Sequence, residues 1–178
     1  MKLLVVLSRF PYPLEKGDKL RAYHQIKILS KFFDIYLFAL SEKTVPQSSI
    51  DALQPFCKQI HIEEINLASK IFNTIFFFFR GLPLQCGFFY RRKAKNALTL
   101  FYNKVQPDKI YCQLVRTAEY VKSFSIDKTI DYQDVLSKGM LRRHSSAPIP
   151  LKPFFKMEYR RLLRYEQQSF NWFDHHTI

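Results

Sequence analysis

The chain has 178 residues, of which 47% are hydrophobic and only 4 are glycine, and this composition excludes an intrinsically disordered protein. The length predicts a single domain whose core is large enough to need no disulfide or metal support. Lysine and arginine outnumber aspartate and glutamate by 28 to 15, a net charge of +13, which favours an anionic partner such as nucleic acid, a phosphorylated substrate or acidic lipid.

Cys57, Cys86 and Cys112 are odd in number and lie far apart without a CxxC motif, so we interpret them as free thiols of a reducing compartment. The chain begins like a signal peptide, with Lys2 before apolar residues, but its apolar run is shorter than the roughly 7–15 residues of a secretory segment. We therefore expect a first strand there and a cytoplasmic protein. No histidine pair has ligand spacing, so the sequence supports no metal site.

The amino-terminal third predicts strands and helices in alternation. Buried or alternating strands are expected at 2–8, 34–40 and 58–65, with a short helix at 46–56. Pro11 and Pro13 predict an extended loop, and Asp18 is the expected N-cap of a helix at 19–33. The buried face of that helix is expected at Leu20, Tyr23, Ile26 (or Lys27), Leu29 and Phe33. This βαβαβ pattern predicts parallel strands joined by right-handed crossovers.

The segment from 66 to 105 has a different character. An apolar helix rich in phenylalanine is expected first, then a break at 81–83 and a basic helix at about 89–105. Between Ile65 and Pro107 the sequence has no acidic residue, against seven basic ones: Lys70, Arg80, Arg91, Arg92, Lys93, Lys95 and Lys104. The apolar part is too short to span a membrane, which takes about 20 apolar residues.

The rest of the chain again alternates. Strands are expected at 109–114 and 127–132, helices at about 115–124 and 152–172, and one further strand from 175. The predicted fold class is therefore α/β: a Rossmann-like three-layer α/β/α domain with a mostly parallel sheet. Because ligands in such folds bind at the carboxyl ends of the strands, the loops after the first strand and after 127–132 are the candidate sites.

The loop after the first strand lacks both GxGxxG and GxxxxGK[ST], which argues against a dinucleotide or P-loop site. It places Arg9, Lys16 and Gly17 before the amino terminus of a helix whose amides can hold an anion. Arg21 and His24 lie one turn apart on one face of that helix. The pattern fits an electropositive pocket for phosphate or sugar hydroxyls, and it equally fits a solvated loop with an ordinary N-cap.

Carboxylates later in the chain are candidates for acid–base chemistry. Asp131 and Asp134, with Ser137, follow the strand at 127–132 and could accept hydrogen bonds from sugar hydroxyls or act as a base. Their spacing alone favours the other interpretation, in which they are turn and cap residues. Glu158 and Glu166, which are flanked by arginines on the last helix, are expected to form local ion pairs.

The phenylalanine-rich and basic block has three interpretations. On one surface it suits an anionic membrane, with contacts from Phe76, Phe77, Phe78, Phe79, Arg80, Arg91, Arg92, Lys93 and Lys95. The same residues suit nucleic acid through phosphate contacts and base stacking, although no nucleic-acid-binding motif is present. The third interpretation is a buried apolar helix beside a solvated basic one.

A resemblance to a known family is carried by Ser8-Arg9-Phe10-Pro11-Tyr12-Pro13, Lys16-Gly17-Asp18-Lys19-Leu20-Arg21 and His24. These residues resemble the amino-terminal domain of GT-B fold glycosyltransferases, in the GT4-like branch of bacterial polysaccharide sugar transferases. The similarity extends over essentially the whole chain, through Asp131-x-x-Asp134-x-x-Ser137, Glu158, Tyr165-Glu166 and Phe173-Asp174.

The resemblance implies the acceptor-side half of a two-domain enzyme that transfers a sugar with retention of configuration and without an essential metal or other cofactor. Gly17 and Asp18 would face the donor diphosphate and the transferred sugar, while Arg21 and His24 would form the cleft wall. The implied substrate-binding residues are Lys16, Gly17, Asp18, Arg21, His24 and Ser137. The implied catalytic residues, on the acceptor side, are Asp131 and Asp134.

The resemblance also sets expectations about partners. The donor-binding carboxy-terminal domain is absent from these 178 residues, so we expect the chain to be inactive alone. Glu158 and Glu166 match the spacing of the family's Glu-x7-Glu donor motif only by accident, because they lie in the other domain. Expected partners are a nucleotide-sugar, a glycan or lipid-linked acceptor, the missing domain or a partner subunit, and an anionic membrane surface, but not nucleic acid. The alternatives are a non-catalytic binding module of the same fold and a basic nucleic-acid-associated α/β domain.

Overall fold

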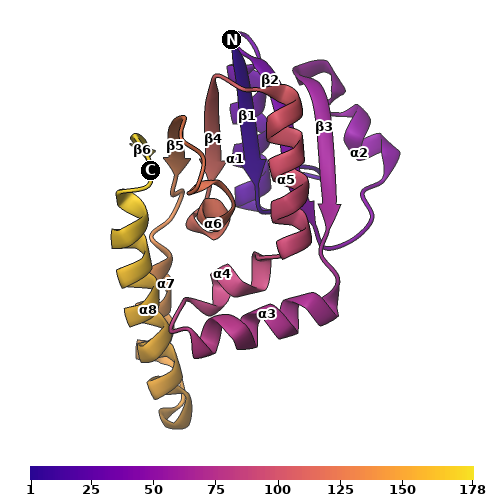
Figure 1. The fold of residues 1–178 in the computed structure, drawn as a ribbon. Coiled ribbons are helices and arrows are strands. Elements are labelled where there is room, and N and C mark those ends of the chain that lie inside the picture. The colour runs from indigo at the N-terminus through magenta and orange to yellow at the C-terminus, as the bar shows by residue number, and fades with distance from the viewer.

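The computed structural model describes residues 1–178, except for the side chains of 67–69. In this described chain, six parallel strands form one sheet in the order β3-β2-β1-β4-β5-β6 (Figure 1). The strands are β1 (Lys2–Leu7), β2 (Asp34–Ser41), β3 (Cys57–Glu64), β4 (Lys109–Gln113), β5 (Asp127–Asp131) and β6 (His175–Thr177). The Rossmann-like α/β fold class and the predicted strands are confirmed.

Helices cover both faces of the sheet, as Figure 1 shows for α5 in front and α1 behind. The helices are α1 (Gly17–Leu29), α2 (Gln47–Asp51), α3 (Leu67–Phe79), α4 (Leu84–Phe89), α5 (Arg92–Val105), α6 (Ala118–Val121), α7 (Leu136–Ser146) and α8 (Lys152–Phe170), with single 3-10 turns η1 (Gln54–Phe56), η2 (Val115–Thr117) and η3 (Ile149–Leu151). The predicted long final helix is α8. The expected helix at 115–124 is shorter and divided into η2 and α6.

Alternating side chains of the central strands build a core on each face. Leu4 and Val6 of β1 pack on the side of α5, α6 and α8, whereas Leu3 and Val5 pack on the side of α1. Because both faces are covered, β1 is apolar almost throughout, as a central parallel strand should be. Each such buried side chain contributes about 1.5–3 kcal/mol.

Helix α1 differs from the prediction at its start and on its inner face. It begins at Gly17, and Asp18 does not cap it but accepts a hydrogen bond from the Arg9 guanidinium at 2.7 Å. The buried residues are Ala22 and Ile26, while Leu20 is 42% exposed. Tyr23, Leu29 and Phe33 pack partly buried against the same core, so the predicted face is confirmed except at Leu20, and polar side chains of α1 also point inward, as described below.

The segment between β3 and β4 contains one helix more than expected, α4. Figure 1 places α3 and α4 beyond the carboxyl ends of the strands. Gly87 lets the two helices approach closely, since a Cβ at that position would lie 2.7 Å from Cβ of Phe77. In the part of the chain that the structure describes, no helix is long and apolar enough to cross a membrane.

The three cysteines are buried free thiols, as predicted. Burial raises the pKa of Cys57 and of Cys112 to about 12 and also raises the pKa of Cys86. The thiols are therefore protonated at neutral pH, and since the thiolate is the nucleophile, they serve as small core side chains.

Candidate functional site

The strand order reverses direction between β1 and β4. From β1 the chain proceeds outward to β2 and β3, and it then returns through α3, α4 and α5 to β4 on the other side of β1. In open α/β sheets, such a switch point leaves a crevice at the carboxyl ends of the strands, where ligands bind. The loop at 8–16 leaves β1 at this edge, beside the loop at 42–46 that leaves β2.

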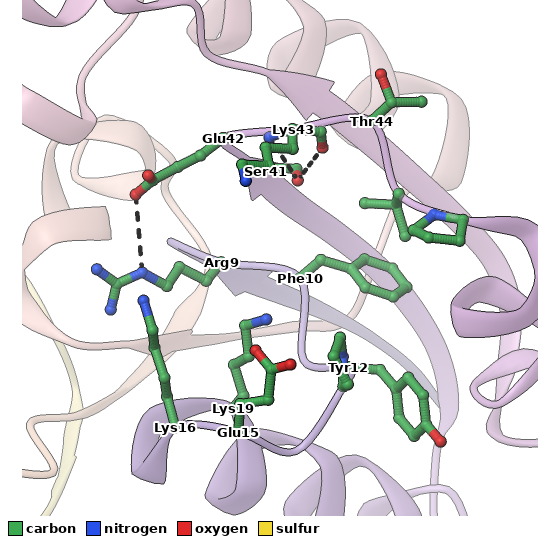
Figure 2. Close-up of a pocket in the computed structure, with 13 residues that line it drawn as sticks. Arg9, Phe10, Tyr12, Glu15, Lys16, Lys19, Ser41, Glu42, Lys43 and Thr44 are labelled. Carbon is green, nitrogen blue, oxygen red and sulfur yellow. Dashed lines mark hydrogen bonds and ion pairs between the residues drawn. The ribbon is translucent and has the colours of Figure 1, made fainter.

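A cavity of about 400 Å³ lies between these two loops (Figure 2). We call it the lysine pocket. Its lining residues are Arg9, Phe10, Tyr12, Pro13, Glu15, Lys16, Lys19, Ser41, Glu42, Lys43, Thr44, Val45 and Pro46. In Figure 2 the charged side chains gather at one end and the rings of Phe10 and Tyr12 at the other. The pocket therefore offers one face for charged or polar groups and one for an apolar surface.

The charges of the lysine pocket are only partly neutralised. Arg9 donates to Asp18 at 2.7 Å, and its Nε lies 3.9 Å from Glu42. Glu42 is in turn paired with the buried Lys70 at 3.1 Å. Lys16, Lys19 and Lys43 have no ion-pair partner among the described side chains. Four cations and two carboxylates line the cavity, so it attracts negatively polarised ligand groups.

Backbone structure holds the two walls in place. No described side chain caps α1, so the positive end of its dipole adds to the charge of Lys16 and Lys19. On the other wall, the Ser41 hydroxyl donates to the carbonyl of Lys43 and accepts from its amide. This turn fixes the loop that carries Lys43 and Thr44 into the pocket.

Arg9 and Lys16, the two basic residues predicted in the first loop, both line the lysine pocket, and Lys16 is the one substrate-binding residue implied by the resemblance that does so. A Cβ on Gly17 would meet nothing within 4 Å, so no close contact requires glycine there. His24 is exposed, and its ring contacts that of Tyr23. Arg21 points to a different part of the molecule, toward Asp131 at the end of β5.

Asp131 is fully buried and accepts hydrogen bonds from five donor groups. Nε and Nη2 of Arg21 approach its two oxygens at 3.0 and 2.9 Å, and Gln25 Nε2 lies at 2.7 Å. The Tyr111 hydroxyl donates at 2.8 Å and the Gln133 amide at 3.0 Å. Burial and this hydrogen bond raise the pKa of Tyr111. The carboxylate thus ties α1 to β4 and β5, and its oxygens are saturated.

Neither Asp134 nor Ser137 contributes to the hydrogen bonds of Asp131. Asp134 is exposed, with Arg142 at 3.9 Å, and Ser137 is buried, where its amide and hydroxyl donate to Glu166 at 3.1 and 2.6 Å. The three residues follow one strand but enter three separate environments. The sequence pattern that suggested paired carboxylates therefore does not correspond to a carboxylate pair.

The expectation of local ion pairs for the glutamates of α8 is wrong. Glu166 fixes the start of α7 through Ser137. Oε1 of the buried Glu158 accepts from the Leu84 amide at 2.8 Å and the Gln85 amide at 3.4 Å, at the start of α4. Burial raises the pKa of Glu158 in spite of these bonds. Both glutamates anchor other helices, which sequence spacing cannot reveal.

The predicted membrane-contact residues divide into two groups. Phe76, Phe78, Phe79, Arg80, Arg92 and Lys93 are exposed. Phe77 is buried, and two half-buried cations of the block donate hydrogen bonds to other parts of the chain. Arg91 donates to the carbonyl of Glu64 at 2.6 Å, and Lys95 donates to Ser123 at 2.9 Å. The expectation of surface contact is therefore wrong for Phe77, which is buried, and it stays a prediction for the half-buried Arg91 and Lys95.

Sequence reasoning missed the second wall of the lysine pocket, at 42–46. Its polar run directly after a strand was the available signal, but only the sheet order places that loop beside the loop at 8–16. Among the side chains that the structure describes, no three His, Cys, Asp or Glu gather as metal ligands would.

Comparisons with known proteins found a curated relative and likenesses among solved structures. No protein-family model matches the sequence. A protein of Klebsiella pneumoniae, "Uncharacterized 44.6 kDa protein in cps region", is 25% identical over 159 residues, which cover 88% of this chain and 37% of that protein. The chain thus spans a little over a third of the relative's length. Phytolacca americana UGT2, complexed with UDP-2fluoro-glucose and pterostilbene, aligns with a TM-score of 0.47 and 10% identity over 81% of this chain and 33% of that one.

Proposed function

We propose that this chain is the acceptor-side domain of a retaining glycosyltransferase that moves a sugar from a nucleotide-sugar to a glycan or lipid-linked acceptor in cell-surface polysaccharide synthesis. One observation carries the proposal. The residues of the first wall of the lysine pocket, from Arg9 to Lys19, belong to the stretch that resembles the amino-terminal domain of GT-B glycosyltransferases. The cps-region relative supports the polysaccharide context.

The lysine pocket has the groups that a sugar requires. Lysine ammonium groups donate hydrogen bonds to hydroxyls or phosphate, and the carboxylates of Glu15 and Glu42 accept them. The Ser41 and Thr44 hydroxyls do both, and the rings of Phe10 and Tyr12 offer apolar surface to the C–H face of a pyranose. The pocket would therefore bind and orient the acceptor, while the donor would be held by a carboxy-terminal domain.

The two candidate catalytic carboxylates receive different roles in this proposal. Asp131 acts as a positioning residue, because Arg21, Gln25 and Tyr111 occupy its oxygens. Asp134 is exposed at the same edge of the sheet and lines a second cavity of about 400 Å³. We retain Asp134 as the carboxylate on the acceptor side.

We further propose that α3 docks the protein on an anionic membrane. Its exposed apolar side chains recur on one face of the helix, at Ile71, Phe72, Ile75, Phe76 and Phe79. The exposed Arg80 follows directly, and Arg92 and Lys93 begin α5. An apolar face bordered by cations suits the headgroup region of a bilayer that contains acidic lipid.

Liposome sedimentation tests the docking. The protein should sediment with vesicles that contain phosphatidylglycerol and much less with phosphatidylcholine alone, and Phe72→Glu/Phe79→Glu should abolish the difference. The matched control is Phe32→Glu, since Phe32 is 72% exposed before β2, at the opposite edge of the sheet. Equal binding by the α3 variant, or salt-sensitive RNA binding without lipid binding, would refute docking through α3.

Sugar transfer itself is tested with the protein in the full length that its gene encodes. Purified protein is incubated with each of a panel of radiolabelled nucleotide-sugars and with a membrane extract that supplies acceptors. Transfer of label to a lipid- or glycan-linked product from at least one donor is expected. A protein that binds glycans but transfers label from none of the donors would instead be a binding module of the same fold.

A further inference from the structure

A second cavity of about 400 Å³ lies at the other side of the switch point, where β4 and β5 end and α7 begins. We call it the arginine pocket. The polar side chains that line it are Gln85, Arg116, Asp134, Arg142, Arg143 and Ser146. Three guanidinium groups thus share the cavity with one carboxylate, and no residue of the lysine pocket lines it.

Arg116 lies in the wall of this cavity with unused hydrogen-bonding capacity. Its Nε and Nη1 are enclosed and have no hydrogen-bond partner among the described residues. Its Nη2 donates a long hydrogen bond, of 3.4 Å, to the side-chain oxygen of Gln85. Buried guanidinium nitrogens nearly always have partners, so a ligand with oxygen acceptors would satisfy these two donors.

The backbone that presents Arg116 is strained. Leu114 follows β4 and precedes η2 with φ 64 and ψ 142, a conformation that residues with a side chain rarely adopt. Its amide donates to the carbonyl of Asp131 at 2.7 Å, so the Asp131 region holds this turn in place. Strain of this kind persists where the surrounding structure enforces it, and it is concentrated at ligand sites.

Phe89 of α4 separates the two pockets. The guanidinium carbon of Arg116 lies 4.9 Å from the centre of the Phe89 ring, and that of Arg9 lies 5.2 Å from it. Burial lowers the pKa of Arg116, and the charge of Arg9 lowers it further. Asp18 neutralises Arg9 directly, whereas Arg116 has no ion pair with any described residue. The switch point therefore holds uncompensated positive charge.

The other two arginines belong to α7 and can contact a ligand in the pocket. Arg142 and Arg143 are exposed, and Arg142 reaches Asp134 only at 3.9 Å. Three guanidinium charges and one carboxylate leave a net charge of +2 on the arginine pocket. A planar guanidinium matches two oxygens of a phosphoryl group at once, which an ammonium group does not.

We propose that the arginine pocket binds a diphosphate. A diphosphate diester carries two negative charges, which the net charge of the pocket balances, and its oxygens satisfy the unpaired nitrogens of Arg116. The role in catalysis rests on the proposed sugar transfer: the diphosphate belongs either to a lipid-linked acceptor or to the nucleotide-sugar. Binding itself requires only the residues described here.

Calorimetric titration of the chain with inorganic pyrophosphate at low ionic strength tests the site. Wild type should bind, and Arg142→Ala/Arg143→Ala should weaken binding at least tenfold with an unchanged melting temperature, since both side chains are exposed. Lys31→Ala/Lys58→Ala removes the same charge from exposed positions that line neither pocket and should bind like wild type. Arg116→Lys keeps the charge but removes the planar guanidinium that can donate to two oxygens at once, and it should also weaken binding.

Three outcomes would overturn the proposal. These are no binding by wild type, equal weakening in Lys31→Ala/Lys58→Ala, and wild-type affinity in Arg142→Ala/Arg143→Ala. Competition identifies the source: displacement of pyrophosphate by farnesyl diphosphate, or by UDP, supports the site and assigns it to acceptor or donor, and displacement by neither contradicts it. Because no sugar is transferred, failure here is distinguishable from failure of the transfer assay.

Discussion

Two charged regions lie at the carboxyl edge of the same sheet and differ in how their charges are used. In the Asp131 network, one buried carboxylate accepts from five donors supplied by α1, β4 and the residues after β5. In the lysine pocket, Lys16, Lys19 and Lys43 face an open cavity without ion-pair partners among the described residues. The first region uses its polar groups to hold the fold, and the second leaves them for a ligand.

The difference shows that residue type alone does not identify a site. Asp131 and Lys16 both follow a strand at the edge where ligands bind, and both belong to stretches that resemble the same family. Burial and pairing separate them: a saturated, buried carboxylate has no capacity left for a substrate, whereas an exposed, unpaired ammonium group has. The predictions below alter one property at a time.

The largest effect is expected from Asp131→Ala. It leaves the Arg21 guanidinium, the Gln25 amide and the Tyr111 hydroxyl without their acceptor, and breaking a buried pair in this way costs about 3–5 kcal/mol. Urea denaturation should show that loss in the free energy of unfolding. Asp134→Ala, which removes an exposed carboxylate from the same loop, should change it by less than about 0.5 kcal/mol. Similar free energies of unfolding for the two variants would contradict the claim that the Asp131 network stabilises the fold.

A smaller effect is expected from Gly87→Ala, which tests the helix that lies between the two pockets. The added Cβ would lie 2.7 Å from Cβ of Phe77 and 2.9 Å from the carbonyl of Asn73, and overpacking of this kind costs about 1–3 kcal/mol. Gly139→Ala is the matched control, since its nearest neighbour would be 3.9 Å away. It should leave stability unchanged or raise it by up to about 1 kcal/mol. Thermal unfolding of both variants provides the measurement.

A still smaller effect on stability is expected at Glu158, a second buried carboxylate, and it distinguishes Glu158 from Asp131. Unlike Asp131, Glu158 has one oxygen without a hydrogen-bond partner in the described structure, and burial raises its pKa. A raised pKa means that the folded state binds the proton more tightly, so this contribution to stability is complete below the unfolded pKa of about 4.3 and is lost as the pH rises through the folded value.

Glu158→Gln removes that titration. The stability of wild type relative to the variant should therefore be greatest near pH 4 and should decline toward neutral pH. Denaturation curves of both proteins across this range give the difference. A difference that is constant with pH, or that grows with rising pH, would show that the Glu158 carboxylate is as well satisfied as that of Asp131.

The sequence predicted the strands well because each is an apolar or alternating run whose length and borders are local properties. On α1 it placed Ile26, Tyr23, Leu29 and Phe33 correctly against the core, but it missed that Arg21 and Gln25 also point inward. A periodicity of apolar residues cannot show this when the inward polar groups are satisfied by a residue more than a hundred positions away. The short helix α4 was missed for the related reason that its six residues span too few turns to show a period.

The candidate site was predictable in part. The first wall of the lysine pocket follows from a basic loop after a central strand, together with the family resemblance. The second wall at 42–46 and the arginine pocket follow only from the sheet order. The partners of Glu158 lie 74 residues away in sequence, so the spacing of the two glutamates had no bearing on what they bind.

The smallest effect on stability and the largest on function are expected from Lys16→Ala/Lys43→Ala. Both side chains are exposed, so the free energy of unfolding should change by less than about 0.5 kcal/mol. Loss of two charged donors should weaken acceptor binding. Each 1.4 kcal/mol of binding free energy that is lost raises the dissociation constant about tenfold. Lys31→Ala/Lys58→Ala, which removes two exposed charges outside the lysine pocket, is the charge-matched control.

The central claim is that the lysine pocket binds the acceptor of a sugar transfer. The most direct measurement is the KM for acceptor at saturating nucleotide-sugar, with the protein in its full encoded length. The account predicts that Lys16→Ala/Lys43→Ala raises this KM at least tenfold, that the KM for the donor is unchanged, and that the control variant behaves as wild type. An acceptor KM equal to that of wild type in the pocket variant, at equal stability, would contradict it.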